Sequence, residues 1–174
     1  MKIQTKKIEK IFGKKVIPFI SVIGIDIATR TGWCRITTDP KKITLDYSFI
    51  NISTANKYFK YNQYIEIFSK ILHRGDIVII EESFYGRNVK TFQLLSRLSA
   101  FAYTIAQLKG ISAKRFLLAT TARKELGFKG NLKKEIIQKQ FLKKLKIKID
   151  DEDIIDAMIL SLTGILENKT IWSS

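Results

Sequence analysis

The stretch Val22-Ile23-Gly24-Ile25-Asp26 carries more information about the fold than any other part of this chain. Its apolar, β-branched residues are typical of a strand buried on both faces, and residues 19–27 together predict one such strand. Asp26 stands at the end of it. A carboxylate with such apolar neighbours must be paired, capped or bound to a metal ion. The alternative is that Asp26 only accepts hydrogen bonds from the following turn, residues 28–32.

Outward from this strand, the pattern predicts an alternation of strands and helices. Strands are expected at 32–38, 43–50, 76–81 and 115–119, and helices at 55–73, 88–109, 132–145 and 152–166. Three successive strands indicate an antiparallel meander, and the later alternation with helices indicates parallel additions. We therefore expect an α/β fold with a mixed five-stranded sheet flanked by helices. It forms one domain, 19–174, after a basic N-terminal arm, 1–18.

The chain is strongly basic, with 31 Lys and Arg against 16 Asp and Glu and a formal net charge of +15. Residues 109–148 concentrate this charge, with thirteen basic and two acidic residues. Such clustering indicates a nucleic-acid partner, although a lysine-rich surface without a specific role is the alternative. Membrane binding is not expected, because no segment pairs the charge with a wide apolar face.

The compartment is expected to be reducing. The chain has one cysteine, Cys34, which excludes an internal disulfide. No secretory signal is visible, and no apolar run is long enough to span a bilayer. These features predict a cytoplasmic protein of a bacterium or of a phage- or virus-infected host cell.

The acids are placed unevenly, because residues 150–156 hold five of them in seven positions. Asp153 and Asp156 are three residues apart at the start of a predicted helix, so they share one face. The helix N-terminus favours negative charge, so Asp150–Asp153 could serve only as caps. That explanation suits Asp156 less well, since it lies a full turn inside the helix among apolar residues.

A second pair of acids, Glu81 and Glu82, ends the second buried strand. Because successive strand side chains point to opposite faces, one of them can join Asp26, and the pattern does not choose between them. Carboxylates gathered in one pocket repel unless something neutralises them, and Mg²⁺ prefers such hard oxygen ligands. Two ions held in this way support phosphodiester cleavage. The residues therefore predict a metal-dependent nuclease.

Three segments resemble motifs of the RuvC-like Holliday junction resolvases, a family of the RNase H-like superfamily. They are Gly24-Ile25-Asp26 with Thr31-Gly32-Trp33 after it, Ile80-Glu81-Glu82-Ser83-Phe84 to Asn88, and Asp153-Ile154-Ile155-Asp156-Ala157. The resemblance implies an RNase H-like fold and a homodimer that nicks four-way DNA junctions in recombination, repair or viral genome processing. It implies two Mg²⁺ (or Mn²⁺) ions per active site, held by Asp26, Glu81, Asp153 and Asp156, and so selects Glu81 over Glu82.

The same resemblance assigns further residues. Lys134 matches an active-site lysine, with Lys133 as the alternative. Phe84 matches an aromatic that stacks at the junction centre, although it could equally be a core residue. The residues expected to contact DNA are Phe84, Arg87, Asn88, Arg123, Lys124, Lys129 and Lys133. Ile27-Ala28 stands where bacterial members have Pro-Gly, and the Ile- and Lys-rich composition is similar to that of phage or poxviral relatives.

Three other functions compete with this interpretation. Residues 24–32 resemble the first phosphate loop of actin- and sugar-kinase-like ATP-binding proteins, but the chain is too short for their two lobes. A DNA-binding protein without catalysis would explain the charge and leave the acids unexplained. A related nuclease for RNA–DNA hybrids or flaps would use the same metal site, so motifs do not separate it from a junction resolvase.

Overall fold

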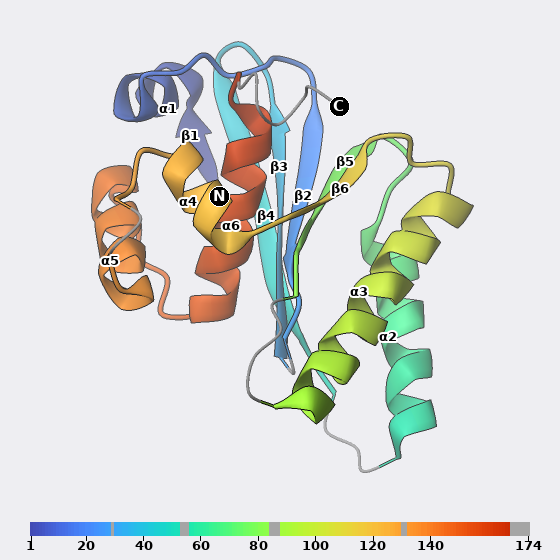
Figure 1. Cartoon of the computed structure of the whole chain (residues 1–174). Coiled ribbons are helices and arrows are strands. Elements are labelled where there is room, and N and C mark those ends of the chain that lie inside the picture. The colour runs from blue at the N-terminus through green and yellow to red at the C-terminus, as the bar shows by residue number, and fades with distance from the viewer. Residues whose placement is uncertain (29, 53–55, 84–87, 130–131, 168–174) are drawn as a thin grey trace.

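A computed structural model of the chain describes residues 1–28, 30–52, 56–83, 88–129 and 132–167. Its centre is a mixed sheet with the strand order β1-β4-β3-β2-β5-β6 (Figure 1). The strands are β1 (Lys2–Gln4), β2 (Ser21–Asp26), β3 (Arg30–Thr38), β4 (Lys42–Asn51), β5 (Asp76–Glu81) and β6 (Lys114–Leu117). The α/β class and the mixed sheet are confirmed, and β5 has the bounds that the sequence predicts.

The sheet combines the two kinds of pairing that the order of elements predicts. β2, β3 and β4 pair antiparallel as a meander. β5 pairs parallel to β2 and β6 pairs parallel to β5. The two parallel strands are reached through helices, as a parallel connection requires. This topology puts the C-terminal ends of β2 and β5 side by side.

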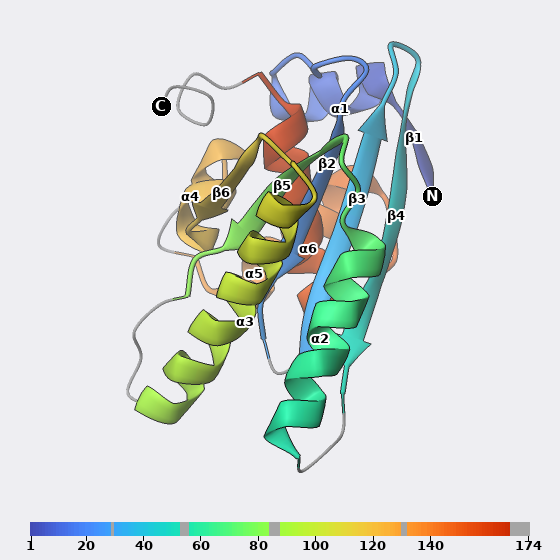
Figure 2. The same ribbon diagram turned by 90° about the vertical axis from the view of Figure 1, so that its right-hand side faces the viewer.

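Helices cover both faces of the sheet (Figures 1 and 2). One face carries α2 (Lys57–Ile71) and α3 (Val89–Leu108). The other carries α1 (Thr5–Phe12), α4 (Ala119–Glu125), α5 (Lys134–Leu145) and α6 (Glu152–Ile165). Each layer has its own apolar core, and α6 is buried along nearly its whole length. None of the helices in the described ranges is long and apolar enough to cross a membrane.

β1 is the strand that the sequence does not predict, and it lies in the segment 1–18 that the charge predicts to be a basic arm. β1 pairs antiparallel with β4, and Ile3 and Ile8 of this segment are buried in the core. Lys14 at the end of the segment forms an ion pair with Glu125 of α4, with 3.0 Å between Nζ and Oε2. Part of the basic N-terminal segment thus belongs to the sheet and its core, and the sheet has six strands where five were expected. A three-residue strand is too short to produce a periodic signal among so many lysines.

Candidate active site

The first two acids meet at the C-terminal ends of β2 and β5. The parallel register pairs Ile25 with Ile80, so Asp26 and Glu81 are the next residues on neighbouring strands. Asp26 is buried, with 7% of its surface exposed, and its carboxyl is hydrogen-bonded to that of Glu81. Glu82, in contrast, is exposed. The structure thus places Glu81 rather than Glu82 beside Asp26, which the sequence pattern alone leaves open.

Electrostatics at this pair are unfavourable without a cation. Burial, the charge and hydrogen bond of Glu81 and the charge of Asp156 raise the pKa of Asp26 to about 9. Burial also raises the pKa of Glu81, and the Asp156 carboxylate acts in the same direction. A raised pKa means that the charged form is disfavoured at this place. The pair therefore retains a proton at neutral pH unless positive charge arrives from elsewhere.

Two glycines let α6 approach the sheet closely enough to bring its acids to this point. A Cβ on Gly24 of β2 would lie 2.4 Å from the carbonyl oxygen of Ala157, and one on Gly32 of β3 would lie 2.2 Å from that of Asp153. The hydroxyl of Ser161 fixes the contact by accepting a hydrogen bond from the Gly24 N–H at 2.9 Å and donating one to the Cys34 carbonyl. The sequence Gly24-Ile25-Asp26 thus allows the close packing of α6 and places Asp26 at the end of β2.

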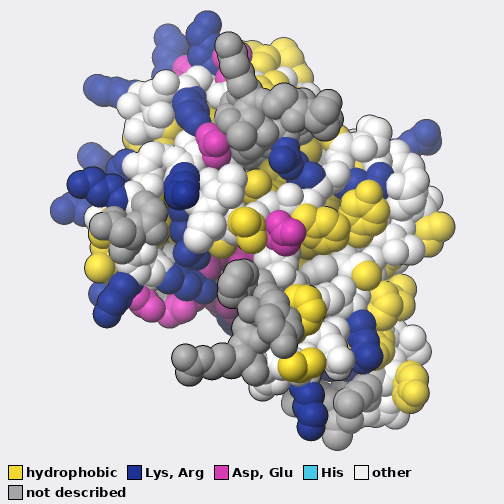
Figure 3. Space-filling view, viewed as in Figure 1, with side chains coloured by type: hydrophobic (Ala, Val, Ile, Leu, Met, Phe, Trp, Pro, Cys, Tyr) yellow, Lys and Arg dark blue, Asp and Glu magenta, His cyan; other side chains and the backbone are white. Residues whose placement is uncertain are grey.

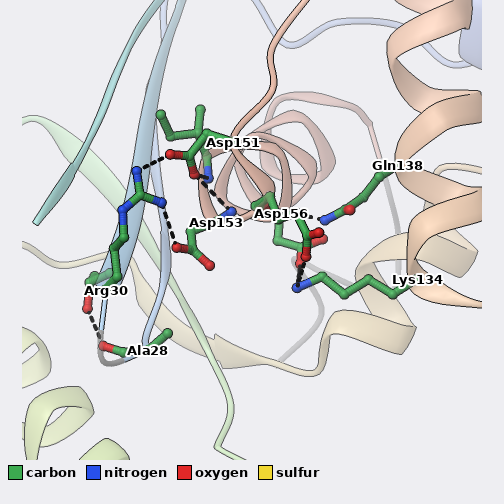
Figure 4. Close-up of polar contacts among 10 residues, drawn as sticks. Ala28, Arg30, Lys134, Gln138, Asp151, Asp153 and Asp156 are labelled. Atoms are coloured by element: carbon green, nitrogen blue, oxygen red, sulfur yellow. Dashed lines mark hydrogen bonds and ion pairs between the residues drawn. The ribbon is translucent and has the colours of Figure 1, made fainter. Parts of the chain in front are cut away.

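Asp156 lies at the centre of this contact, only 4% exposed, and is bound by two cations. Lys134 Nζ, from the first turn of α5, lies 2.7 Å from Oδ2 (Figure 4). Arg123 Nη2 of α4 donates to Oδ1 at 3.2 Å. Burial acts to lower the pKa of Lys134, but the hydrogen bond and charge of Asp156 outweigh it and raise that pKa. Lys133, the alternative lysine, is exposed.

Asp153 is engaged differently, although it is one turn from Asp156. Its Oδ2 accepts a hydrogen bond of 2.9 Å from Nη1 of Arg30, and Nη2 of the same guanidinium binds Asp151 (Figure 4). Asp151 is the N-cap of α6 and accepts hydrogen bonds from the N–H groups of Asp153 and Ile154. Capping therefore accounts for Asp151, while Asp153 is bound to an arginine from β3.

The donor set fits a divalent cation in chemical type. Asp26, Glu81, Asp153 and Asp156 offer only carboxylate oxygens, which hard cations prefer, and the raised pKa of Asp26 shows that positive charge is lacking there. As the side chains stand, however, no three His, Cys, Asp or Glu within the described ranges are arranged to hold an ion. The contacts of Asp153 and Asp156 with Arg30 and Lys134 compete with such an arrangement.

The residues expected to contact DNA differ in their surroundings. Lys124, Lys129 and Lys133 are exposed. Arg123 is instead half-buried beside Asp156, and its Nε is buried without a hydrogen bond. Asn88 is exposed and also caps α3 by accepting from the Thr91 N–H. The expectations for Phe84 and Arg87 lie outside the described residues.

The basic surface coincides with one helical layer. Lys and Arg side chains gather over α1, α4 and α5, and they are sparser over α2 and α3 (Figure 3). Acidic side chains show at the lower edge of the basic half, toward the N-terminal end of α6. The acids thus border a positively charged surface, as polyanion binding requires.

Sequence reasoning missed Arg30 as a residue of the site. It begins β3, four residues after Asp26, but its partners Asp151 and Asp153 lie more than 120 positions further along the chain. A one-dimensional pattern has no signal for a pair so distant. Arg123 was found as a basic residue, but its position inside the acid cluster depends on the short helix α4, which was also missed.

Comparison with known proteins gives similar solved structures. A Thermus thermophilus RuvC structure has a TM-score of 0.69 and 18% sequence identity, covering 85% of this chain and 99% of that chain. The structure of T. thermophilus RuvC in complex with Holliday junction substrate has a TM-score of 0.69 and 19% identity, covering 83% and 91%. No family model and no curated protein sequence matches the chain. At this identity the likeness shows the fold, which is RuvC-like within the RNase H-like class.

Proposed function

We propose that this protein is a metal-dependent endonuclease that nicks four-way DNA junctions, a Holliday junction resolvase. The observation that carries the proposal is the buried pair of Asp26 and Glu81, whose raised pKa values express a need for positive charge. A structural protein has no reason to place two carboxylates together at the end of a buried sheet. The junction as substrate is supported by the RuvC-like fold, one example of which is complexed with a Holliday junction.

In this proposal Asp26, Glu81, Asp153 and Asp156 hold two Mg²⁺ or Mn²⁺ ions. When bound, such ions lower the pKa of an attacking water and stabilise the oxygen that leaves in phosphodiester hydrolysis. Glu81 and Asp26 give up their shared proton as the cations bind, because the coordinating form is the carboxylate.

The cations of the chain have complementary roles. Lys134 holds Asp156 in place through its 2.7 Å contact, and its side chain is still 38% exposed, so its ammonium can also meet a phosphate oxygen. Arg123 binds the other oxygen of Asp156 and is more deeply buried, which suits it to orient the carboxylate rather than the substrate. Lys124, Lys129 and Lys133 then bind the flanking phosphates, because these exposed lysines belong to the basic layer.

A homodimer is part of the proposal, since two nicks at a four-way junction need two sites. α3 has one face on the core, with Leu98, Ala102 and Ile105 buried. Its other side carries an apolar surface that continues onto the edge strand β6. Tyr103 and Phe116 stack there with ring centroids 5.5 Å apart, and both are more than a third exposed. Such a surface at a sheet edge is suited to a second copy.

The test uses labelled four-way junction, flap, duplex and RNA–DNA hybrid of equal length, each with Mg²⁺ or with EDTA. We expect paired nicks in the junction with Mg²⁺ only. Asp26→Asn is expected to bind the junction without nicking it. Cleavage confined to hybrids or flaps would replace the junction assignment and keep the metal site. Undiminished cleavage by Asp26→Asn would contradict the metal site itself.

A further inference from the structure

Arg30 lies at the site, but the proposed function assigns it no role. It begins β3, four residues after Asp26, and its side chain is about one-third exposed. The guanidinium forks across two carboxylates of the α6 N-terminus, with Nη1 on Asp153 and Nη2 on Asp151 (Figure 4). An arginine fork with two acceptors is a directional contact that fixes the positions of the groups it joins.

The guanidinium of Arg30 stacks on an aromatic ring. Its Cζ lies 3.6 Å from the ring centroid of Phe49, which is a cation–π contact. Phe49 is opposite Gly32 in the antiparallel register of β3 and β4, and Gly32 has no side chain to separate the ring from Arg30. Arg30 is therefore positioned by the sheet itself, independently of the acids that it binds.

The two carboxylates that Arg30 binds differ in their other contacts. Asp151 is occupied as the N-cap of α6, since its second carboxylate oxygen accepts hydrogen bonds from two backbone N–H groups. Asp153 has no other ion pair than Arg30 among the described residues. The carboxylate that the proposed metal site needs is thus the one whose only counter-charge is Arg30.

We propose that Arg30 is a positioning residue that stands in for the metal at Asp153, so that metal loading exchanges the Arg30–Asp153 ion pair for a metal bond. In the metal-free protein the pair keeps Asp153 from repelling Asp156 one turn away. When an ion binds, Asp153 transfers to it, while Arg30 stays on Phe49 and Asp151. The inference rests on the proposed metal site, and it specifies what holds Asp153 in position before a metal ion binds.

The test measures Mn²⁺ binding by calorimetry, without DNA and without an activity assay. Arg30→Met keeps an unbranched side chain over Phe49 and removes the charge. We expect it to bind Mn²⁺ roughly two- to fivefold more tightly, since the competing ion pair is partly exposed and weak. Arg30→Lys is expected to restore affinity toward that of the wild type. Lys139→Met is the matched control, because it removes one exposed charge from α5.

A double-mutant cycle separates the ion pair from general electrostatics. In an Asp153→Asn background, Arg30→Met should no longer tighten binding, because the pair is already absent. An equal gain in both backgrounds, or an equal gain from Lys139→Met, would show a long-range charge effect and overturn the inference. Weaker binding by Arg30→Met would overturn it as well, since Arg30 would then assist the metal. If the wild-type protein does not bind Mn²⁺ at all, the proposed metal site itself is contradicted, and the inference about Arg30 falls with it.

Discussion

The strand pair β2–β5 carries a buried carboxylate at each end, and the fold treats the two in opposite ways. Asp76, at the start of β5, accepts hydrogen bonds from Ser21 at 2.7 Å, from Nε and Nη2 of Arg35 at 3.1 and 2.9 Å, and from the His73 N–H. Burial acts to raise its pKa, but the bonds from Arg35 and Ser21 outweigh burial and lower it. Asp26, at the far end of β2, has a pKa raised to about 9.

This difference indicates that Asp76 stabilises the fold, whereas Asp26 is available to bind a cation. Asp76 receives its full counter-charge from Arg35, which is itself 9% exposed. The cations near Asp26, Lys134 and Arg123, are bound to Asp156 instead, so the Asp26–Glu81 pair keeps a deficit of positive charge. A buried acid without a counter-charge is a functional candidate, whereas a fully bonded one is structural.

The largest effect is expected from Asp26→Asn on cleavage. The amide offers one oxygen without charge, so the proposed metal site loses a ligand, and junction nicking should fall to about 1% of the wild-type rate or less. The melting temperature of the metal-free protein should not fall. Asp46→Asn, the same change at an exposed position of β4, is the control and should leave nicking unchanged. A large loss of stability in Asp26→Asn would mean that both ends of the strand pair are structural.

Asp76→Asn should destabilise the protein, because it removes the structural acid at the other end of the strand pair. It leaves the buried Arg35 without its partner, which costs about 3–5 kcal/mol of unfolding free energy. Urea denaturation measures this loss. Nicking assayed well below the melting temperature should persist, because Asp76 lies at the opposite end of β5 from Glu81. If nicking disappeared while the protein remained folded, the division between the two ends would not hold.

Lys134→Ala tests whether the cation beside Asp156 takes part in chemistry. It removes the 2.7 Å contact with Asp156 and an exposed ammonium, so nicking should fall by roughly 10- to 100-fold. Lys139→Ala, on the same helix and exposed, should change it little. Equal losses in the two variants would indicate that Lys134 contributes only to the general positive charge of the basic surface.

The pH dependence of stability should differ in sign between the two acids. The folded-state pKa of Asp26 lies above its ordinary value of 3.8, so the stability that its proton contributes is present at low pH and is lost as pH rises toward about 9. The lowered pKa of Asp76 works oppositely, and its contribution is lost as pH falls below the ordinary value. Thermal unfolding in EDTA between pH 5 and 9 should therefore show a decline with pH that Asp26→Asn reduces.

The expected size of this effect is at least about 1 kcal/mol at pH 8, or about 2–4 °C in melting temperature for a chain of this length. Mg²⁺ should reverse the decline, since it replaces the missing positive charge. Parallel curves for the wild type and Asp26→Asn would contradict the burial of an unneutralised Asp26.

Much of the fold followed from local pattern. The strand Asp76–Glu81 is apolar on both faces and ends in charge, so its bounds could be predicted, and the helix at 152–166 was found within one residue of its observed end. The antiparallel meander and the parallel additions follow from the order of elements. β1, α1 and α4 were not predicted, because these elements are short and depend on the sheet and core that receive them.

At the site, the sequence by itself determined which chemistry is present: Asp26, Glu81, Asp153 and Asp156 are acids that end buried strands or begin a buried helix, in a chain of net charge +15. Only the tertiary structure decided their partners. It placed Glu81, which the family resemblance selects and the strand pattern leaves open, beside Asp26 through the register of β2 and β5. It also gave Arg123 and Lys134 to Asp156, and Arg30 to Asp153. The reason is that composition and periodicity are local properties of a chain, whereas the counter-charge of a carboxylate comes from whichever cation folding brings within about 4 Å.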